Sequence, residues 1–279
     1  MTDLYRVLSK APNYIRRFGL FSGLRLLGQI ERSLPERSPV VKRYAVPGQP
    51  GRIALRESVA DHAIFWQCLV RNQYDVRSYP QAKRLVAAYE EQIRRGIRPL
   101  IIDCGANVGL ASIWFAQQFP EARICAVEPD EQNFALLTEN TAPIHDRMLL
   151  LRGGIWSHTS HLRISNQESG SASFRVEPTE PGGRQAIRAY TIAEVCALAG
   201  ATAAFIVKID IEGAQKDLFA RNTEWVGAVH LIALELDDWL MPWHGSRPFF
   251  SCVSRHPFDY VISGETIFCF RDFESNHAC

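Results

Sequence analysis

The sequence lacks the cysteine pairs, apolar spans and leader pattern that mark several large classes of protein. Its seven cysteines form no C-x-x-C pair and are scattered, which favours reduced thiols over a disulfide framework or a zinc site. No apolar run approaches the roughly 18 residues of a membrane span. Asp3, Arg6 and Lys10 interrupt the apolar core that a signal peptide would have. We therefore expect a cytoplasmic protein.

An excess of charge of one sign is also missing. The formal net charge is +1 over 279 residues, of which 22% are charged and 47% hydrophobic. Such a chain has no global field to attract nucleic acid, so we expect no nucleic-acid partner. No H-x-x-x-H or comparable helical spacing supports a metal site, so no metal is predicted. The length and apolar content suit one α/β domain with an added segment.

The most informative stretch, 100–109, reads L-I-I-D-C-G-A-N-V-G. Its apolar run predicts a buried strand that ends near Asp103, and Gly105 and Gly109 lead into a predicted helix over 110–118. In α/β folds a strand, a glycine turn and a helix in this order hold nucleotide-like ligands. The carboxylate of Asp103 would repel a pyrophosphate but attract an ammonium group and a sulfonium. The loop therefore favours S-adenosylmethionine.

A second apolar run, 122–128, ends in Glu128, about 25 residues beyond the first acid. An acid in this position lies at the tip of the neighbouring strand, where it can bind both ribose hydroxyls. Pro129 ends the strand, and Asp130 can cap a helix over 131–140. The predicted cofactor-binding residues are Asp103, Gly105, Ala106, Asn107, Gly109, Glu128 and Pro129.

A third acidic strand end lies in 205–214, which reads F-I-V-K-I-D-I-E-G-A. In a parallel sheet Asp210 emerges at the same carboxyl edge as the first two acids, where open α/β sheets bind ligands. Carboxylates and Lys208 gathered at one edge are typical of a proton-accepting site. Glu212 as a helix cap and Lys208 as a salt-bridge partner along the strand are the structural alternatives.

From residue 99 onwards the pattern alternates between strands and helices, which predicts a parallel sheet. The stretch 156–190, rich in Ser, Gly and Pro, predicts a hairpin-and-loop insertion near the strand tips, and 258–263 with 266–270 predicts a closing antiparallel hairpin. The result is a seven-stranded, mostly parallel sheet. The parallel strands are predicted at 100–103, 122–128, 149–155, 203–210 and 229–236.

We divide the chain into an N-terminal extension, 1–78, and a cofactor-binding domain, 79–279. Residues 1–40 are basic and amphipathic, which predicts a helix packed on its own domain; a peripheral membrane contact and a homodimer contact remain open. A hairpin is predicted over 41–58. Two helices should follow, one capped by Asp61 and running to about Arg71, the other running from Pro80 to about Arg95.

The motifs I-I-D-C-G-A-N-V-G, A-V-E-P-D-E-Q-N-F-A-L-L and I-V-K-I-D-I-E-G-A-Q together resemble the FkbM family of S-adenosylmethionine-dependent methyltransferases. The resemblance covers about residues 100–270, and its last motif is the most specific part. Gln215 departs conservatively from a Glu that is common there. The resemblance implies a Rossmann-like class I methyltransferase fold and O-methylation of a small-molecule or glycan acceptor, such as a sugar or a secondary metabolite.

An alcohol acceptor is a poor nucleophile until it loses its proton, so a general base is useful. Asp210 is the predicted base, with Lys208 and Glu212 as the other catalytic residues. A metal held by acids could lower the pKa of the acceptor instead, but no ligand spacing supports one. The alternative bases are three histidines, His158, His161 and His244.

Three other functions fit the sequence less well. A nucleic-acid methyltransferase on the same fold would need a basic, aromatic-rich face, which only residues 1–40 offer. A dinucleotide-dependent reductase is disfavoured by Asp103 and by the missing G-x-G-x-x-G spacing, and no G-x-x-x-x-G-K-[ST] phosphate loop occurs. A non-catalytic scaffold that binds no cofactor would not need two acidic strand tips.

Overall fold

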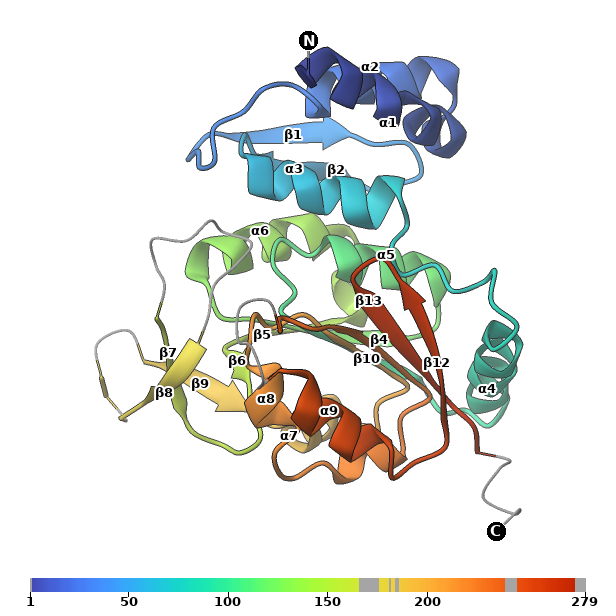
Figure 1. Ribbon diagram of the computed structural model, residues 1–279, viewed down its shortest axis with the longest axis vertical. Coiled ribbons are helices and arrows are strands. Elements are labelled where there is room, and N and C mark those ends of the chain that lie inside the picture. The colour runs from blue at the N-terminus through green and yellow to red at the C-terminus, as the bar shows by residue number, and fades with distance from the viewer. Residues whose placement is uncertain (1, 166–175, 181, 184–185, 239–244, 274–279) are drawn as a thin grey trace.

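The computed structural model describes residues 2–165, 176–180, 182–183, 186–238 and 245–273. Its centre is a seven-stranded sheet in the order β12-β13-β11-β10-β3-β4-β5 (Figure 1). Five strands are parallel: β3 (Leu100–Cys104), β4 (Arg123–Glu128), β5 (Met148–Arg152), β10 (Ile206–Ile209) and β11 (Leu231–Glu235). The antiparallel pair is β12 (Phe258–Ser263) and β13 (Thr266–Arg271). This is the class I methyltransferase arrangement, as predicted.

The sheet is buried on both faces because its strands are apolar at almost every position. Side chains alternate: Ile101, Ile124 and Ile206 belong to the core on one face, whereas Ile102 and Val207 belong to the core on the other. Figure 1 shows α5 and α6 over one face and α7, α8 and α9 over the other. These helices are α5 (Leu110–Gln118), α6 (Glu131–Thr141), α7 (Ile192–Leu198), α8 (Gln215–Leu218) and α9 (Ser246–Val253).

Short elements complete the cofactor domain. Two 3-10 helices span Ala142–Arg147 and Glu224–Gly227. The predicted insertion is a second sheet in the order β6-β9-β7-β8, and its strand β8 was not predicted. Its strands are β6 (Gly154–Ile155), β7 (His161–Ile164), β8 (Val176–Thr179) and β9 (Ile187–Tyr190).

The N-terminal extension begins with an antiparallel pair of helices, α1 (Thr2–Phe18) and α2 (Leu20–Ile30). The predicted hairpin follows as β1 (Val41–Ala45) and β2 (Arg52–Arg56). Next come α3 (Val59–Phe65), a π-helix (Trp66–Val70) and α4 (Ala82–Arg94). The prediction that Asp61 caps α3 is wrong, because the hydroxyl of Ser58 accepts the hydrogen bond from the Asp61 backbone N–H. Asp61 is instead a fully buried partner of Arg56, at 2.9 Å.

The extension and the cofactor domain share one hydrophobic core. Tyr14 and Leu26 of the helical pair belong to the same cluster as Phe115 of α5 and Phe205 before β10. The first helices are therefore packed on their own chain, at the top of Figure 1. Within the described ranges no helix is both long and apolar enough to cross a membrane. Six cysteines in those ranges are free thiols, and all are buried.

Candidate functional site

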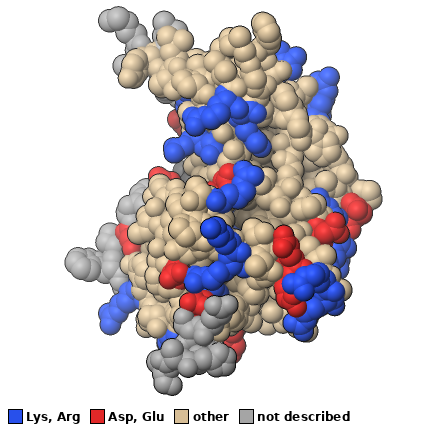
Figure 2. Space-filling view, turned by 90° about the vertical axis from the view of Figure 1, so that its right-hand side faces the viewer, with Lys and Arg blue, Asp and Glu red and all other residues tan. Residues whose placement is uncertain are grey.

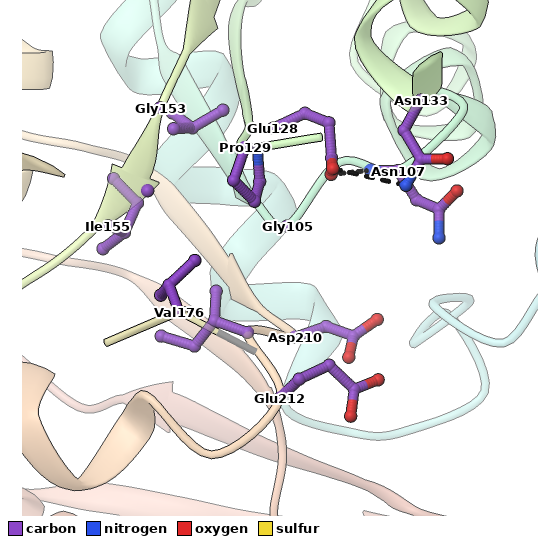
Figure 3. A pocket seen from close by; sticks show the side chains of 13 residues that line it. Gly105, Asn107, Glu128, Pro129, Asn133, Gly153, Ile155, Val176, Asp210 and Glu212 are labelled. Carbon is purple, nitrogen blue, oxygen red and sulfur yellow. Dashed lines mark hydrogen bonds between the residues drawn. The ribbon is translucent and has the colours of Figure 1, made fainter. Parts of the chain in front are cut away.

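A cavity of about 510 Å³ lies at the carboxyl ends of β3, β4 and β10. We call it the first cavity. Figure 3 shows the side chains that line it: Glu128 and Asn133 on one side, Asp210 and Glu212 on the other, and Ile155 closing a third side. Carboxylates thus stand at two sides of a partly apolar space, which suits a ligand with hydroxyl groups, a positive charge and an aromatic ring.

The glycine loop forms the floor of this cavity and is joined to the strands on both sides. Gly105 has a left-handed φ of 76°, and a Cβ at this position would lie 1.8 Å from the carbonyl oxygen of Asp210. The backbone N–H groups of Gly105 and Ala106 both donate to the carbonyl of Val127, at 3.0 Å. Only glycine fits where two loops meet through backbone alone.

Glu128 lies at the tip of β4 and lines the first cavity, as predicted for the ribose-binding acid. Its side chain accepts the backbone N–H groups of Asn107 at 2.8 Å and Asp130 at 2.9 Å. Burial raises the pKa of Glu128 to about 7, although these hydrogen bonds favour its ionised form. The carboxyl is therefore held rigidly while facing the cavity. Its contact with a ribose remains a prediction.

Asp103 lines neither cavity of the site, contrary to its predicted contact with the ligand. Its side chain is 0% exposed, accepts a hydrogen bond from the hydroxyl of Ser112 at 2.6 Å and pairs with Lys208 at 3.1 Å. Lys208 also donates to the carbonyl of Gly105 at 2.8 Å and lies 3.5 Å from Asp210. Burial opposes the charge of Lys208, but Asp103 and Asp210 raise its pKa above the ordinary value. Asp103 is thus an internal counter-ion that secures the glycine loop through Lys208.

Gly109 also lines neither cavity, although its backbone has the left-handed φ expected at the start of a helix, 86°. A Cβ at Gly109 would lie 2.7 Å from Cδ1 of Leu137 and 3.4 Å from Cγ2 of Thr141, both on α6. The left-handed φ and the close approach of Leu137 and Thr141 therefore favour glycine at this position, which lines neither cavity.

A second cavity, of about 1130 Å³, opens on the other side of the glycine loop. Both cavities are lined by Gly105, Asn107, Asp210 and Glu212, which makes Asp210 and Glu212 a common wall. Of the predicted residues, Ala106 and Lys208 also line the second cavity. Its carboxylates are Asp210, Glu212, Glu235, Asp237 and Glu265.

The turn after β10 presents Glu212 to both cavities. Glu212 has a left-handed φ of 49°, and non-glycine residues in this conformation concentrate at functional sites. Asp237 holds the turn by accepting the backbone N–H of Gly213 at 2.9 Å and the side-chain amide of Gln215 at 2.7 Å. Glu212 does not cap α8, whose N-cap is Ala214. The departure of Gln215 from the usual Glu therefore places an amide donor on Asp237.

The N-terminal extension supplies one wall of the second cavity, which the sequence did not predict. The π-helix carries two of the lining residues, and such helices occur frequently at functional sites. Glu235, the last residue of β11, also lines this cavity. The lining residues from the extension are Ile64, Gln67, Cys68 and Tyr74.

Two of the three histidines considered as alternative bases, His158 and His161, do not line the site. His158 contacts Arg221 at 2.9 Å and Ser157 at 3.2 Å, and His161 starts β7; neither lines a cavity of the site. His244 lies outside the described residues. Within the described part of the chain, no group of His, Cys, Asp and Glu is arranged to hold a metal ion.

Residues 103–236 match the family model described as the methyltransferase FkbM domain. This chain carries an FkbM methyltransferase domain. The domain is that of an S-adenosylmethionine-dependent methyltransferase, so S-adenosylmethionine is its cofactor. It includes the glycine loop, Glu128 and the Asp210 turn, but ends before the C-terminal hairpin and excludes the N-terminal extension.

Two curated proteins are similar to parts of the chain. The 2-O-methyltransferase NoeI of Sinorhizobium fredii is 26% identical over 156 residues, which are 50% of this chain and 64% of that protein. The methyltransferase sdnD of Sordaria araneosa is 41% identical over 44 residues, 16% of this chain and 17% of that protein. The match spans less than two thirds of either relative. Among solved structures, the METTL16 methyltransferase domain covers 97% of this chain and 92% of its own at a TM-score of 0.43 and 9% identity.

The first cavity of the FkbM domain fits the cofactor. Glu128 offers an acceptor to ribose hydroxyls, and the carboxylates of Asp210 and Glu212 offer acceptors to an ammonium group. Val127 and Ile155 provide apolar surface for an aromatic base. Among the described residues, no cationic side chain lines this cavity, which agrees with a ligand that carries no phosphate.

Proposed function

We propose that this protein is an S-adenosylmethionine-dependent O-methyltransferase that acts on a hydroxyl of a sugar, glycan or secondary metabolite. One observation carries the proposal: the cofactor cavity and an acid-lined cavity share Asp210 and Glu212 as a wall. A methyl donor in one cavity and an acceptor in the other would meet there, which is the alignment that methyl transfer requires.

The charges of the second cavity favour a neutral, hydroxyl-rich acceptor. Five carboxylates line it, and Lys208, the cation among its described lining residues, is already paired with Asp103. Carboxylates accept hydrogen bonds from hydroxyl groups and repel phosphates and other anions. The 2-O-methyltransferase among the relatives is consistent with a hydroxyl acceptor. A nucleic-acid substrate is disfavoured, because its phosphates would approach these acids.

The chemistry divides simply between cofactor and protein. Bound S-adenosylmethionine would supply an electrophilic methyl group, with a neutral thioether as the leaving group. The protein binds the acceptor, orients its hydroxyl toward the shared wall and removes the hydroxyl proton. Asp210 and Glu235 both face the second cavity and are the carboxylates placed to take part, with Lys208 fixing the position of Asp210 and Glu212 completing the wall.

Transfer of a labelled methyl group tests this function. Purified protein with methyl-labelled S-adenosylmethionine should label neutral oligosaccharides or hydroxylated metabolites, and the label should resist mild base, as an ether does and an ester does not. Phosphorylated sugars and RNA serve as matched anionic acceptors. Labelling of RNA alone would replace the proposal with a nucleic-acid methyltransferase, and failure to bind S-adenosylhomocysteine would indicate a non-catalytic scaffold.

A further inference from the structure

Glu235 lies inside the second cavity and is held there by two neutral groups. It ends β11 and stands opposite Thr266 in the antiparallel pair with β13. The Thr266 hydroxyl donates to Oε1 of Glu235 at 3.4 Å, and the side-chain amide of Gln73 donates to the same oxygen. The structure records no hydrogen bond from the described residues to Oε2 of Glu235. That oxygen is the one available to a bound molecule.

The position of Gln73 is itself fixed by the N-terminal extension. Its backbone N–H donates to the carbonyl of Gln67 in the π-helix at 3.0 Å, and its side chain also reaches the Thr266 hydroxyl at 3.0 Å. The preceding residue, Asn72, has a left-handed φ of 51° and accepts a hydrogen bond from the indole of Trp114 at 3.2 Å. Gln73 is thus presented to Glu235 by a constrained turn.

Asp210 differs from Glu235 in its partner. Lys208 lies 3.5 Å from Asp210, so the charge of that carboxylate is already matched by a cation. The hydrogen-bond partners of Glu235 are an amide and a hydroxyl, which carry no charge. A carboxylate without a cation in contact has the stronger tendency to take a proton.

We propose that Glu235, oriented by Gln73, is the general base that accepts the proton of the acceptor hydroxyl. The assignment rests on the proposed O-methyltransferase function. The acceptor's O–H bond breaks, its proton passes to Oε2 of Glu235, and its oxygen keeps the electron pair that forms the new bond to carbon. After product leaves, Glu235 releases the proton to water. Asp210 then orients the acceptor, and Gln73 is a positioning residue.

The surroundings of Glu235 set the pH at which it can act. Burial first, and then the charge of Asp210, raise the pKa of Glu235 to about 8, while the charge of Lys208 acts in the opposite direction. A base must be ionised to accept a proton, so kcat/KM should rise with pH through about 8. The charged and titratable groups that face Glu235 from the surrounding elements are Asp210, Lys208, Glu265, Tyr74 and Cys68.

The test separates binding, proton transfer and the function itself. Glu235→Gln should bind S-adenosylhomocysteine as the wild type does, while kcat falls on the order of 10²–10⁴-fold and the rise near pH 8 disappears. Asp210→Asn removes a charge that raises the pKa of Glu235, so the rise should move to lower pH. Gln73→Leu removes a hydrogen-bond donor that favours the ionised form of Glu235, so in this variant the rise in kcat/KM should move to higher pH. Glu265→Gln removes another carboxylate of this cavity, whose charge also raises the pKa of Glu235, so this variant should keep the rise but move it to lower pH.

A second readout needs neither cofactor nor acceptor. Carbon-13 NMR of glutamate-labelled protein should show a carboxyl that titrates near pH 8 and is lost in Glu235→Gln. Full activity in Glu235→Gln would overturn the assignment of Glu235 as the base but not the proposed function. The same conclusion would follow if the rise in kcat/KM near pH 8 were lost only in Asp210→Asn. A wild type that methylates no hydroxyl would overturn both.

A separate observation concerns the outward surface of the N-terminal helices. Several large apolar side chains there are exposed: Phe21 by 87%, Tyr5 by 78% and Leu8 by 59%. On α2, Phe21, Leu24 and Arg25 follow helical spacing and share one stripe, opposite the buried Leu26 and Leu27. In Figure 2 much of the described surface at this end of the molecule carries no charged residue, and Lys and Arg lie beside it.

Arg25 also belongs to a basic groove of about 800 Å³ between α2 and the β1–β2 hairpin. Glu57 and Glu139 pair with some of its cations, which leaves an excess of positive charge. Exposed apolar side chains can enter the acyl boundary of a membrane, and a basic groove beside them can contact its anionic headgroups. We infer that α2 and this groove dock on such a surface. The basic residues of the groove are Arg25, Arg32, Lys42, Arg43 and Arg52.

Co-sedimentation with vesicles tests this docking. The protein should bind vesicles rich in phosphatidylserine more tightly than pure phosphatidylcholine vesicles, and salt should weaken the binding. Phe21→Ser and Arg25→Glu should each lower binding several-fold. Ile262→Ser, which changes another side chain exposed by 73% on β12, should not. Equal binding by all variants would overturn the inference, and so would a dimer in sedimentation velocity that Phe21→Ser abolishes.

Discussion

Gly105 and Asp210 meet through their backbones alone, since a Cβ on Gly105 would lie 1.8 Å from the Asp210 carbonyl oxygen. The contact joins the loop that follows β3 to the loop that follows β10, and both loops line both cavities. Any side chain at Gly105 must push the two loops apart and so distort the wall that the two cavities share.

Gly105→Ala should therefore abolish measurable binding of S-adenosylhomocysteine. The matched control is Gly96→Ala, because Gly96 has a similar φ of 71° but no atom within 4 Å of the position that a Cβ would take. Both variants carry the same backbone penalty of about 1 kcal/mol, and only Gly105→Ala adds a steric clash. Calorimetry on the two folded proteins distinguishes the effects. Normal affinity in Gly105→Ala would show that the loops separate without consequence for the cofactor.

Glu128 should make cofactor affinity depend on pH. Ribose hydroxyls would donate to the ionised carboxylate in the predicted contact, whereas the pKa of Glu128 is raised to about 7 in the protein. Affinity should therefore decline as pH falls below about 7, where a proton competes for the carboxylate. Glu128→Ala should weaken binding by about 1.5–3 kcal/mol at neutral pH and remove this dependence. Titration calorimetry with S-adenosylhomocysteine across this pH range measures both effects, and equal affinity in the variant would refute the ribose contact.

Lys208 and Asp103 should depend on each other for stability. Asp103 is 0% exposed and Lys208 is 3% exposed, so Lys208→Met leaves a buried carboxylate without its cation. The expected loss in the free energy of unfolding is about 3–5 kcal/mol. Adding Asp103→Asn removes the uncompensated charge and should restore part of that loss, since the hydrogen bond from Ser112 can persist. Denaturant unfolding of the two single variants and the double variant measures the coupling free energy between Lys208 and Asp103. If the two losses in unfolding free energy simply add, the ion pair contributes nothing to stability.

Gly109 should matter for stability more than for binding. In Gly109→Ala the new Cβ meets Leu137 of α6 at 2.7 Å, and neither residue lines a cavity of the site. Gly19 is the matched control, because it also begins a helix with a left-handed φ, 79°, but has open space around it. Gly109→Ala should lower Tm clearly more than Gly19→Ala, while the folded variant keeps its affinity for S-adenosylhomocysteine. Loss of affinity with an unchanged Tm would restore the predicted ligand contact.

Local signals in the sequence predicted the elements around the site well. The helix α5 spans Leu110–Gln118 as predicted, and Asp130 caps α6 by accepting the backbone N–H of Asn133. The C-terminal hairpin also agrees with prediction. These features depend on short-range chemistry, namely apolar runs, capping side chains and glycine turns, all of which a single sequence displays.

The partners across the sheet could not be predicted, because they depend on register. Lys208 stands directly opposite Asp103 in the parallel pair of β10 and β3, so each neutralises the other. The sequence shows the charge of Asp103 but not this neighbour, and the carboxylate was therefore assigned to a ligand. The same limit applies to Gln73 and Glu235, which meet across 162 residues of chain. Likewise, the sequence indicated a left-handed turn at Gly109 but not that α6 lies against it.

The origin of the second cavity's walls has a consequence for how such enzymes diversify. The residues that line the first cavity lie within 103–236, whereas Ile64, Gln67, Cys68 and Tyr74 line the second cavity, the proposed acceptor site, from outside that range. With the acceptor in the second cavity, as proposed, substitutions in the segment 64–74 would change acceptor choice and leave the lining of the first cavity unchanged. In this architecture the site for the methyl donor and an exchangeable recognition surface occupy separate stretches of one chain, so selection can act on each alone.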